Sequence, residues 1–150
     1  MSVKTSTDIT VMSTLAAVNE QAAFNRWAGF EVASAKPGEV ELRMPWRDEV
    51  GQYSGFLHAG LIGALIDTVC GFAAGTVSGQ VLASQFSVRC IAPAKGRMFI
   101  AKGRVVKAGK RQVFTAAELY CETPGSGEMT LCATGDAIFV PLGELQERPV

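Results

Sequence analysis

The sequence predicts an α+β domain in which a long central helix is wrapped by a curved antiparallel sheet of five to six strands. The stretch from Phe56 to Val77 is apolar on nearly every face, which is typical of a buried helix. Several other segments alternate apolar and polar residues with a period of two, which indicates half-buried strands. Such a helix is covered on all sides if the sheet curls around it.

The composition fits one domain with a substantial core. The chain has 150 residues, of which 48% are hydrophobic. Lys and Arg number 14, as do Asp and Glu, so no overall field favours nucleic acid or an anionic membrane. We expect a flexible N-terminal segment (residues 1–18), a single domain (residues 19–141) and a C-terminal tail (residues 142–150). The N-terminal segment lacks the pattern of a secretory signal, which favours a cytoplasmic location.

The first elements follow from local patterns. Residues 19–27 place apolar side chains at helical spacing, which predicts a short helix. Residues 30–35 form an expected strand. Residues 39–44 alternate in polarity after the turn-forming run Lys36 to Glu39, so the two strands are expected to form a hairpin.

A polar loop at residues 46–55 leads into the long helix, which we expect to end at Ser78 and Gly79. The period then changes from 3.6 to 2. Four strands are predicted after the helix, joined by short turns as an antiparallel meander: residues 85–90, 97–106, 111–121 and 128–140.

The apolar stretch contains the chain's only histidine, His58, and a single acid, Asp67, nine residues later. Along one helix, nine residues at about 100° each put the two side chains on opposite faces, about 13 Å apart along the axis. They cannot be partners within one subunit. A site that uses both needs His58 in the entry loop or a second copy of the chain, and we expect both.

Metal chemistry is not indicated. None of the four cysteines forms a CxxC pair, and one histidine offers little to a metal site. We expect reduced, buried thiols, no metal and no cofactor. The cysteines are Cys70, Cys90, Cys121 and Cys132.

A membrane span is the alternative interpretation of the apolar stretch. It has sufficient length, and Gly71 with Gly75 supplies a small-xxx-small pattern. Asp67 near its middle would cost a few kcal/mol in lipid, and the surrounding strands are amphipathic. We therefore expect a core helix and no membrane partner.

The motif from Gln52 to Gly60, followed by Leu65 to Thr68, resembles the signature of the phenylacetyl-CoA-type acyl-CoA thioesterases, which have the hotdog fold. The likeness runs from about Asn19 to Val140. Two positions depart from it. The family usually has His-Gly-Gly, whereas Ala59 takes the middle place here, and Gln52 stands where many members have Asn. A backbone N–H is still supplied by alanine.

The resemblance implies hydrolysis of an acyl-CoA, with an aromatic or medium-chain acyl group, to free acid and CoA. Free N–H groups of Ala59 and Gly60 at the helix start would stabilise the oxyanion. Asp67 would reach the thioester from the other subunit, as a general base or as a nucleophile. His58 would orient the loop or bind near the thioester, and Gln52 would position water or the carbonyl.

Further residues are expected to contact the substrate. Gly55 belongs to the motif and Thr68 neighbours Asp67, although Thr68 could instead bond within its helix. The family's hydroxyl near the acyl group matches either Ser84 or Ala83. Candidates for the CoA phosphates are basic residues near turns: Lys95, Arg97, Lys110 and Arg111.

Other functions remain open. A non-catalytic hotdog module that binds acyl-CoA would be favoured if Ala59 and Gln52 spoil the oxyanion geometry. Asp67 could instead accept buried backbone hydrogen bonds as a structural residue. A site shared between subunits predicts a homodimer with two-fold symmetry, or a dimer of dimers, which would be a homotetramer.

Overall fold

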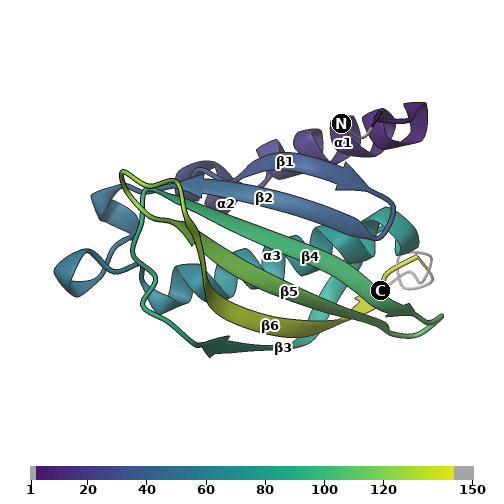
Figure 1. Ribbon diagram of the computed structural model, residues 1–150. Coiled ribbons are helices and arrows are strands. Elements are labelled where there is room, and N and C mark those ends of the chain that lie inside the picture. Colours follow the sequence, from purple (N-terminus) through teal and green to yellow (C-terminus); the bar gives the residue numbers. More distant parts are fainter. Residues whose placement is uncertain (1–2, 144–150) are drawn as a thin grey trace.

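The computed structural model describes residues 3–143 and consists of one antiparallel sheet of six strands around a long helix (Figure 1). The strand order is β1-β2-β4-β5-β6-β3. The strands are β1 (Glu31–Lys36), β2 (Glu39–Pro45), β3 (Val81–Cys90), β4 (Met98–Ala108), β5 (Val113–Glu122) and β6 (Met129–Pro141). The helices are α1 (Ser6–Gln21), α2 (Ala23–Ala28) and α3 (Ala59–Ser78). The expected hotdog architecture is confirmed.

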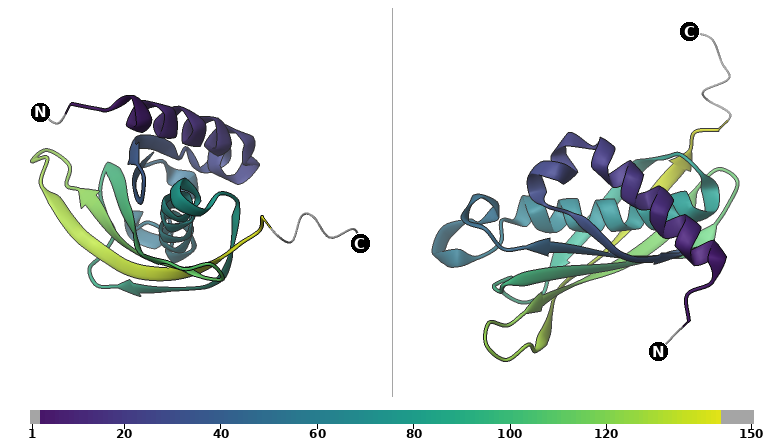
Figure 2. Two further views of the ribbon diagram at one scale, coloured as in Figure 1. Left: turned by 90° about the vertical axis from the view of Figure 1, so that its right-hand side faces the viewer. Right: turned by 90° about the horizontal axis from the view of Figure 1, so that it is seen from above.

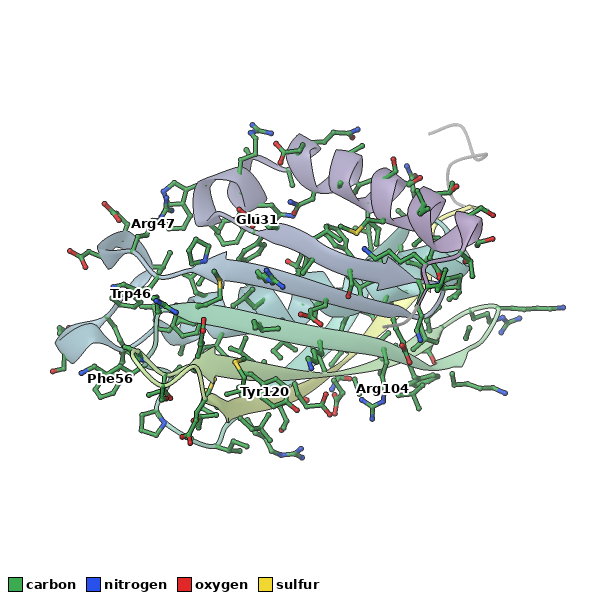
Figure 3. The ribbon with its side chains drawn as sticks, turned by 45° about the horizontal axis from the view of Figure 1, so that its top comes forward. Glu31, Trp46, Arg47, Phe56, Arg104 and Tyr120 are labelled. Carbon is green, nitrogen blue, oxygen red and sulfur yellow. The ribbon has the colours of Figure 1, made fainter. Side chains whose placement is uncertain are left out.

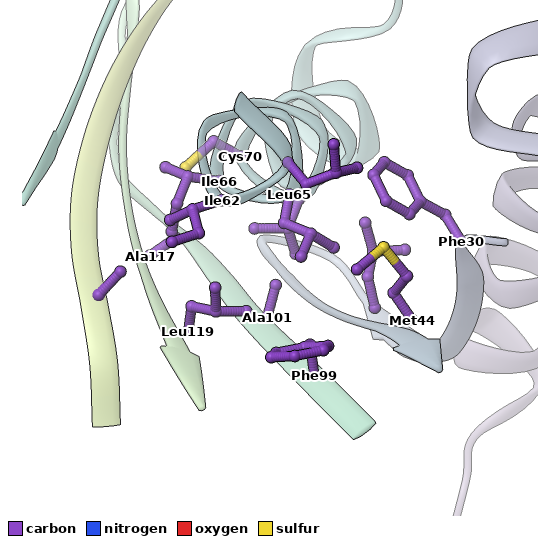
Figure 4. Close-up of a cluster of buried hydrophobic side chains, with 14 of the residues drawn as sticks. Phe30, Met44, Ile62, Leu65, Ile66, Cys70, Phe99, Ala101, Ala117 and Leu119 are labelled. Atoms are coloured by element: carbon purple, nitrogen blue, oxygen red, sulfur yellow. The ribbon is translucent and has the colours of Figure 1, made fainter. Parts of the chain in front are cut away.

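Helix α3 lies at the centre of the core, and the strands turn alternate side chains toward it. Figure 4 shows Leu65 and Ile66 of α3 among side chains of the facing strands, including Leu119. The fully buried set includes Leu42, Met44, Leu65, Ile66, Val69, Phe99 and Leu119. Burial of one such side chain stabilises the fold by about 1.5–3 kcal/mol, so the contact between α3 and the sheet contributes strongly to stability.

Two strand glycines let the sheet approach α3 closely. A Cβ at Gly103 would lie 2.8 Å from the carbonyl oxygen of Val69, and one at Gly135 would lie 2.6 Å from Cγ2 of Ile66. Real side chains do not tolerate such distances. The sheet can therefore contact the helix this closely only because Gly103 and Gly135 have no side chain.

Among residues 3–143, α3 is the one helix long and apolar enough to cross a membrane. The sheet accounts for that apolarity, because β2, β3, β4, β5 and β6 all contact the helix. The chain uses α3 as a core helix.

The N-terminal segment differs from expectation. Residues 1–18 were expected to be flexible, but α1 begins at Ser6. A capping box fixes this start: the N–H of Asp8 donates to Oγ1 of Thr5 at 3.1 Å, and the Asp8 carboxylate accepts from the N–H of Thr5 at 3.2 Å. Only Leu15 and Asn19 of this helix are buried. Because so little of the helix is buried, its sequence has no clear apolar stripe from which a helix could be predicted.

The predicted helix at residues 19–27 is divided between α1 and α2, because Ala22 has an extended backbone. Asn19 and Asn25 hold this region together. Nδ2 of Asn19 donates to the Phe30 carbonyl at 2.7 Å, and Nδ2 of Asn25 donates to Oδ1 of Asn19 at 3.1 Å. Figure 2 shows that α1 lies over α3 on the side that β4, β5 and β6 leave open.

Strand β3 forms one edge of the sheet. It begins at Val81, earlier than the expected residue 85, and pairs with β6. Most of its residues are exposed, among them Leu82 at 62% and Phe86 at 49%. An apolar edge strand is a surface on which another strand can pair. Of the predicted tail at residues 142–150, residues 144–150 lie outside the described part of the chain.

Candidate functional site

His58 is the N-cap of α3, and its backbone is extended with φ −62° and ψ 135°. Its Nδ1 atom accepts a hydrogen bond from the N–H of Gly60 at 2.8 Å. Because Nδ1 accepts, the proton of a neutral ring lies on Nε2. The expectation that His58 stands in the entry loop is correct, and the helix starts three residues later than the apolar stretch.

The imidazole folds over Gly60, where a Cβ would lie 2.9 Å from Nδ1. This contact explains the glycine. It also changes the expected oxyanion site, because the N–H of Gly60 is already bonded to His58. Ala59 is the first residue of the helix, so its N–H has no acceptor within the helix, and none is found among residues 3–143. Ala59 is exposed and provides the free donor at this helix start.

The loop before His58 is held by backbone pairing. The N–H of His58 donates to the carbonyl of Val50 at 3.0 Å, and the N–H of Leu57 donates to the carbonyl of Ala94 at 2.8 Å. Nε2 of Gln52 donates to the Leu57 carbonyl at 3.1 Å. Gln52 therefore supports the loop from within, whereas an amide directed at water or substrate was expected.

Gly55 has a left-handed backbone with φ +75°, and Ser54 beside it has φ 59°. This turn carries the chain back toward the helix start. Figure 3 shows Phe56 at the same end of the sheet as Trp46. Nζ of Lys95 lies 5.5 Å from the centre of the Phe56 ring, so this lysine is a basic residue beside the loop.

Asp67 lies on α3 between its buried face and solvent. No group among residues 3–143 donates a hydrogen bond to its carboxylate or pairs with its charge. Burial raises the pKa of Asp67 above its ordinary value, because desolvation disfavours the charged form. The structural alternative, a carboxylate satisfied by backbone donors, is wrong for this carboxylate.

The Asp67 side chain opens into a cavity of about 770 Å³. Its walls come from α1, α2, α3, β3 and β6, and they are mainly apolar. The polar residues in the lining are Thr14, Asn25, Asp67, Thr68 and Gln80. The contribution of α1, which includes Leu15 and Val18, was missed because that helix was not predicted. Phe72 lines the cavity, whereas Phe86 does not.

One protomer does not bring His58 and Asp67 together. The helix runs unbroken from Ala59 to Ser78, so Asp67 lies about 13 Å along its axis from the N-cap His58. Thr68, in contrast, lines the same cavity as Asp67.

Ser84 and Ala83 were the two candidates for the position near the acyl group. Ala83 lines the cavity and Ser84 does not. Ser84 lies where the pairing of β3 with β6 shifts register, and its Oγ donates to the Ile138 carbonyl at 3.2 Å. The β-bulge turns the serine away from the expected position.

Lys110 and Arg111 lie in the exposed turn between β4 and β5. This turn is at the opposite end of the sheet from the loop that precedes α3 (Figure 1). Within one protomer these residues are therefore remote from His58. Arg97 pairs with Glu122 at 3.3 Å, so a phosphate would compete with this carboxylate for the guanidinium.

The cysteines offer no nucleophile at the cavity. Burial raises the pKa of Cys70 to about 11, so its thiol stays protonated near neutral pH. Cys121 and Cys132 are buried, and their sulfur atoms are 2.8 Å apart. Cys90 is exposed, so the expectation that all four cysteines are buried is wrong for this residue. Within residues 3–143 no three His, Cys, Asp or Glu side chains are grouped to hold a metal.

The cap predicts different effects for two substitutions of His58. His58→Ala removes the acceptor for Gly60 and is expected to lower the free energy of unfolding by about 1 kcal/mol. His58→Asn keeps a good N-cap and should lose much less. Urea denaturation of the two variants measures the difference, and equal losses would contradict a capping role.

Comparison with known proteins identifies the family. The thioesterase superfamily profile matches residues 54–128, half of the chain. A protein of Halobacterium salinarum named as an esterase is 31% identical over 122 residues, covering 74% of this chain and 79% of the relative.

Solved structures agree with the fold. A thioesterase family protein from Silicibacter pomeroyi has a TM-score of 0.82 and 29% identity, covering 87% of this chain and 96% of that one. The PaaI protein of the E. coli phenylacetic acid degradation operon has a TM-score of 0.80 at 17% identity, covering 92% and 97%, and supports the fold alone. The chain belongs to the thioesterase superfamily, and hydrolysis of thioesters is the general chemistry that this membership supports.

Proposed function

We propose that the protein hydrolyses an acyl-CoA thioester to the free acid and CoA. The observation that carries the proposal is Asp67, an unpaired carboxylate with a raised pKa at an apolar cavity. The same helix presents the free N–H of Ala59 at its positive end. A carboxylate and an oxyanion donor are the groups that acyl transfer requires.

In this mechanism the thioester carbonyl oxygen accepts a hydrogen bond from Ala59, and Nε2–H of His58 is a second donor at the same helix start. If Asp67 acts as a general base, it takes a proton from water while the water oxygen attacks the carbonyl carbon. The C–S bond then breaks and the CoA thiolate takes up the proton. If Asp67 is the nucleophile, a mixed anhydride forms, CoA leaves, and water hydrolyses the anhydride.

The proposed active unit is a homodimer that pairs the two β3 edges. Antiparallel pairing across a two-fold axis reverses the direction of the second copy. The start of α3 in one subunit would then approach the Asp67 half of α3 in the other. Exposed Leu82 and Phe86 support this interface, because pairing would bury them.

The same arrangement bears on CoA binding. Lys110 and Arg111, remote from His58 in their own protomer, would lie nearer the entry loop of the second copy. With Lys95 beside that loop, they are the proposed contacts for the CoA phosphates. We further propose a cytoplasmic enzyme, in which a dimer of dimers is the larger assembly.

The proposal is tested by measuring thiol release from straight-chain and aromatic acyl-CoAs. We expect turnover without added metal. Micromolar binding of an acyl-CoA without turnover would instead support the non-catalytic binding module.

A shared site predicts that two inactive variants restore each other. Asp67→Asn and Ala59→Pro damage different halves of the site, so a mixed dimer keeps one complete site. Statistical mixing should restore about a quarter of wild-type activity, because half of the dimers are mixed and each has one intact site of two. Co-refolded variants are assayed against each variant alone. No gain after verified mixing would contradict a shared site.

A further inference from the structure

The cavity beside Asp67 is elongated along α3. Its lining includes Asp67, Thr68, Gly71, Phe72 and Gly75, which lie on one side of the helix over successive turns. Gly75 is eight positions after Asp67, so the cavity extends about 12 Å along the axis. Gly79, Gln80 and Leu142 line its far end.

Gly75 marks a space that the protein leaves unfilled. A Cβ built at Gly75 would meet no atom within 4 Å among the described residues, although the residue lies inside a helix. Glycine inside a helix is unfavourable relative to alanine. Gly71, one turn earlier, differs because its Cβ would lie 3.2 Å from the Phe139 ring. Neither backbone conformation nor packing in the described chain requires Gly75.

Helix α1 forms the wall opposite α3. Thr14, Leu15 and Val18 line the cavity from this side, and Val18 is 44% exposed. Helix α1 packs on β1, and two asparagine hydrogen bonds tie its end to Phe30 and to α2. Figure 2 shows α1 crossing over α3.

We propose that this cavity binds an extended aliphatic acyl chain and that Gly75 sets the length of chain accepted. The inference rests on the proposed function, because Asp67 fixes the position of the thioester at one end. A benzene-sized group fits a cavity of about 150 Å³. The volume here is about 770 Å³, and its mainly apolar walls follow α3 beyond Asp67 over about two turns, which favours an extended chain over a compact aromatic ring.

The test compares Gly75→Leu with wild type on butyryl-, octanoyl-, decanoyl- and phenylacetyl-CoA. Val77→Leu is the matched control, since Val77 lies on the same helix, is 45% exposed and does not line the cavity. In wild type, kcat/KM should rise from butyryl to decanoyl and exceed that for phenylacetyl. Gly75→Leu should lower the ratio of kcat/KM for decanoyl to that for butyryl at least about tenfold, and Val77→Leu should leave it unchanged.

A second readout does not depend on turnover. Binding of S-alkyl-CoA thioethers, which cannot be hydrolysed, is measured by calorimetry for the same proteins. Wild-type Kd should fall up to about fourfold per methylene, and this gain should stop at shorter chains in Gly75→Leu.

Failure of the two proposals can be distinguished. Absence of turnover with chain-length-dependent thioether binding would reject hydrolysis and keep the chain-length inference. A preference for phenylacetyl, or the same length profile in Gly75→Leu as in wild type, would overturn the inference. Dissociation of Gly75→Leu into monomers would also overturn it, because the space would then belong to a second copy of the chain.

Discussion

Asp67→Asn is expected to lower kcat for acyl-CoA hydrolysis at least about a hundredfold, within the range of general-base catalysis. Asparagine keeps the size of the side chain but can neither take a proton from water nor form an anhydride. No group among residues 3–143 pairs with Asp67, so the substitution breaks no hydrogen bond or ion pair there. The measurement is steady-state kinetics on the best substrate of the acyl-CoA panel.

The matched control is Asp48→Asn, since Asp48 is an exposed acid in a short helical turn away from the cavity. It should keep wild-type kcat. A folded, dimeric Asp67→Asn variant with undiminished turnover would show that the site has been assigned wrongly.

Desolvation of Asp67 also predicts a pH dependence. A base must be unprotonated, so the acid limb of kcat/KM should lie above the ordinary pKa of an aspartate. The free energy of unfolding changes with pH in the direction opposite to that caused by a salt-bridged carboxylate. The folded state binds the proton more tightly than the unfolded state, so wild-type stability falls as pH rises from the unfolded to the folded pKa. Asp67→Asn should remove this loss, which thermal unfolding at acid and neutral pH can measure.

Ala59→Pro is expected to lower kcat by about a hundredfold to a thousandfold, the effect of removing one oxyanion donor. Proline has no N–H, but it is favoured at the first position of a helix. The preceding residue also suits it, because His58 has ψ 135°, the extended conformation that proline requires before it. The substitution therefore deletes the donor while α3 is retained.

Ala59→Ser is the control, because serine keeps the backbone N–H. It should retain most of the wild-type kcat. Circular dichroism and the Kd of an S-alkyl-CoA establish that Ala59→Pro still folds and binds. If Ala59→Pro folds, binds and turns over at the wild-type rate, the oxyanion is stabilised elsewhere.

Local patterns in the sequence were sufficient for the central architecture. A helix apolar on nearly all faces must be buried, and period-two strands supply the cover, so α3 and its sheet follow from residue order. The same reasoning placed His58 before the helix and separated it from Asp67. It failed for α1, because only two residues of that helix are buried and the capping box was not recognised.

Tertiary structure decided which groups surround each candidate. The sequence by itself determined the central fold, the family signature and the separation of His58 from Asp67 along one helix. Contacts between distant segments determined the rest, because hydrogen-bond partners and burial depend on how the chain folds back. They left the Asp67 carboxylate unpaired and lined its cavity with α1. The two short-range hydrogen bonds, from Gly60 to His58 and from Gln52 to Leu57, depend instead on the conformation of the entry loop.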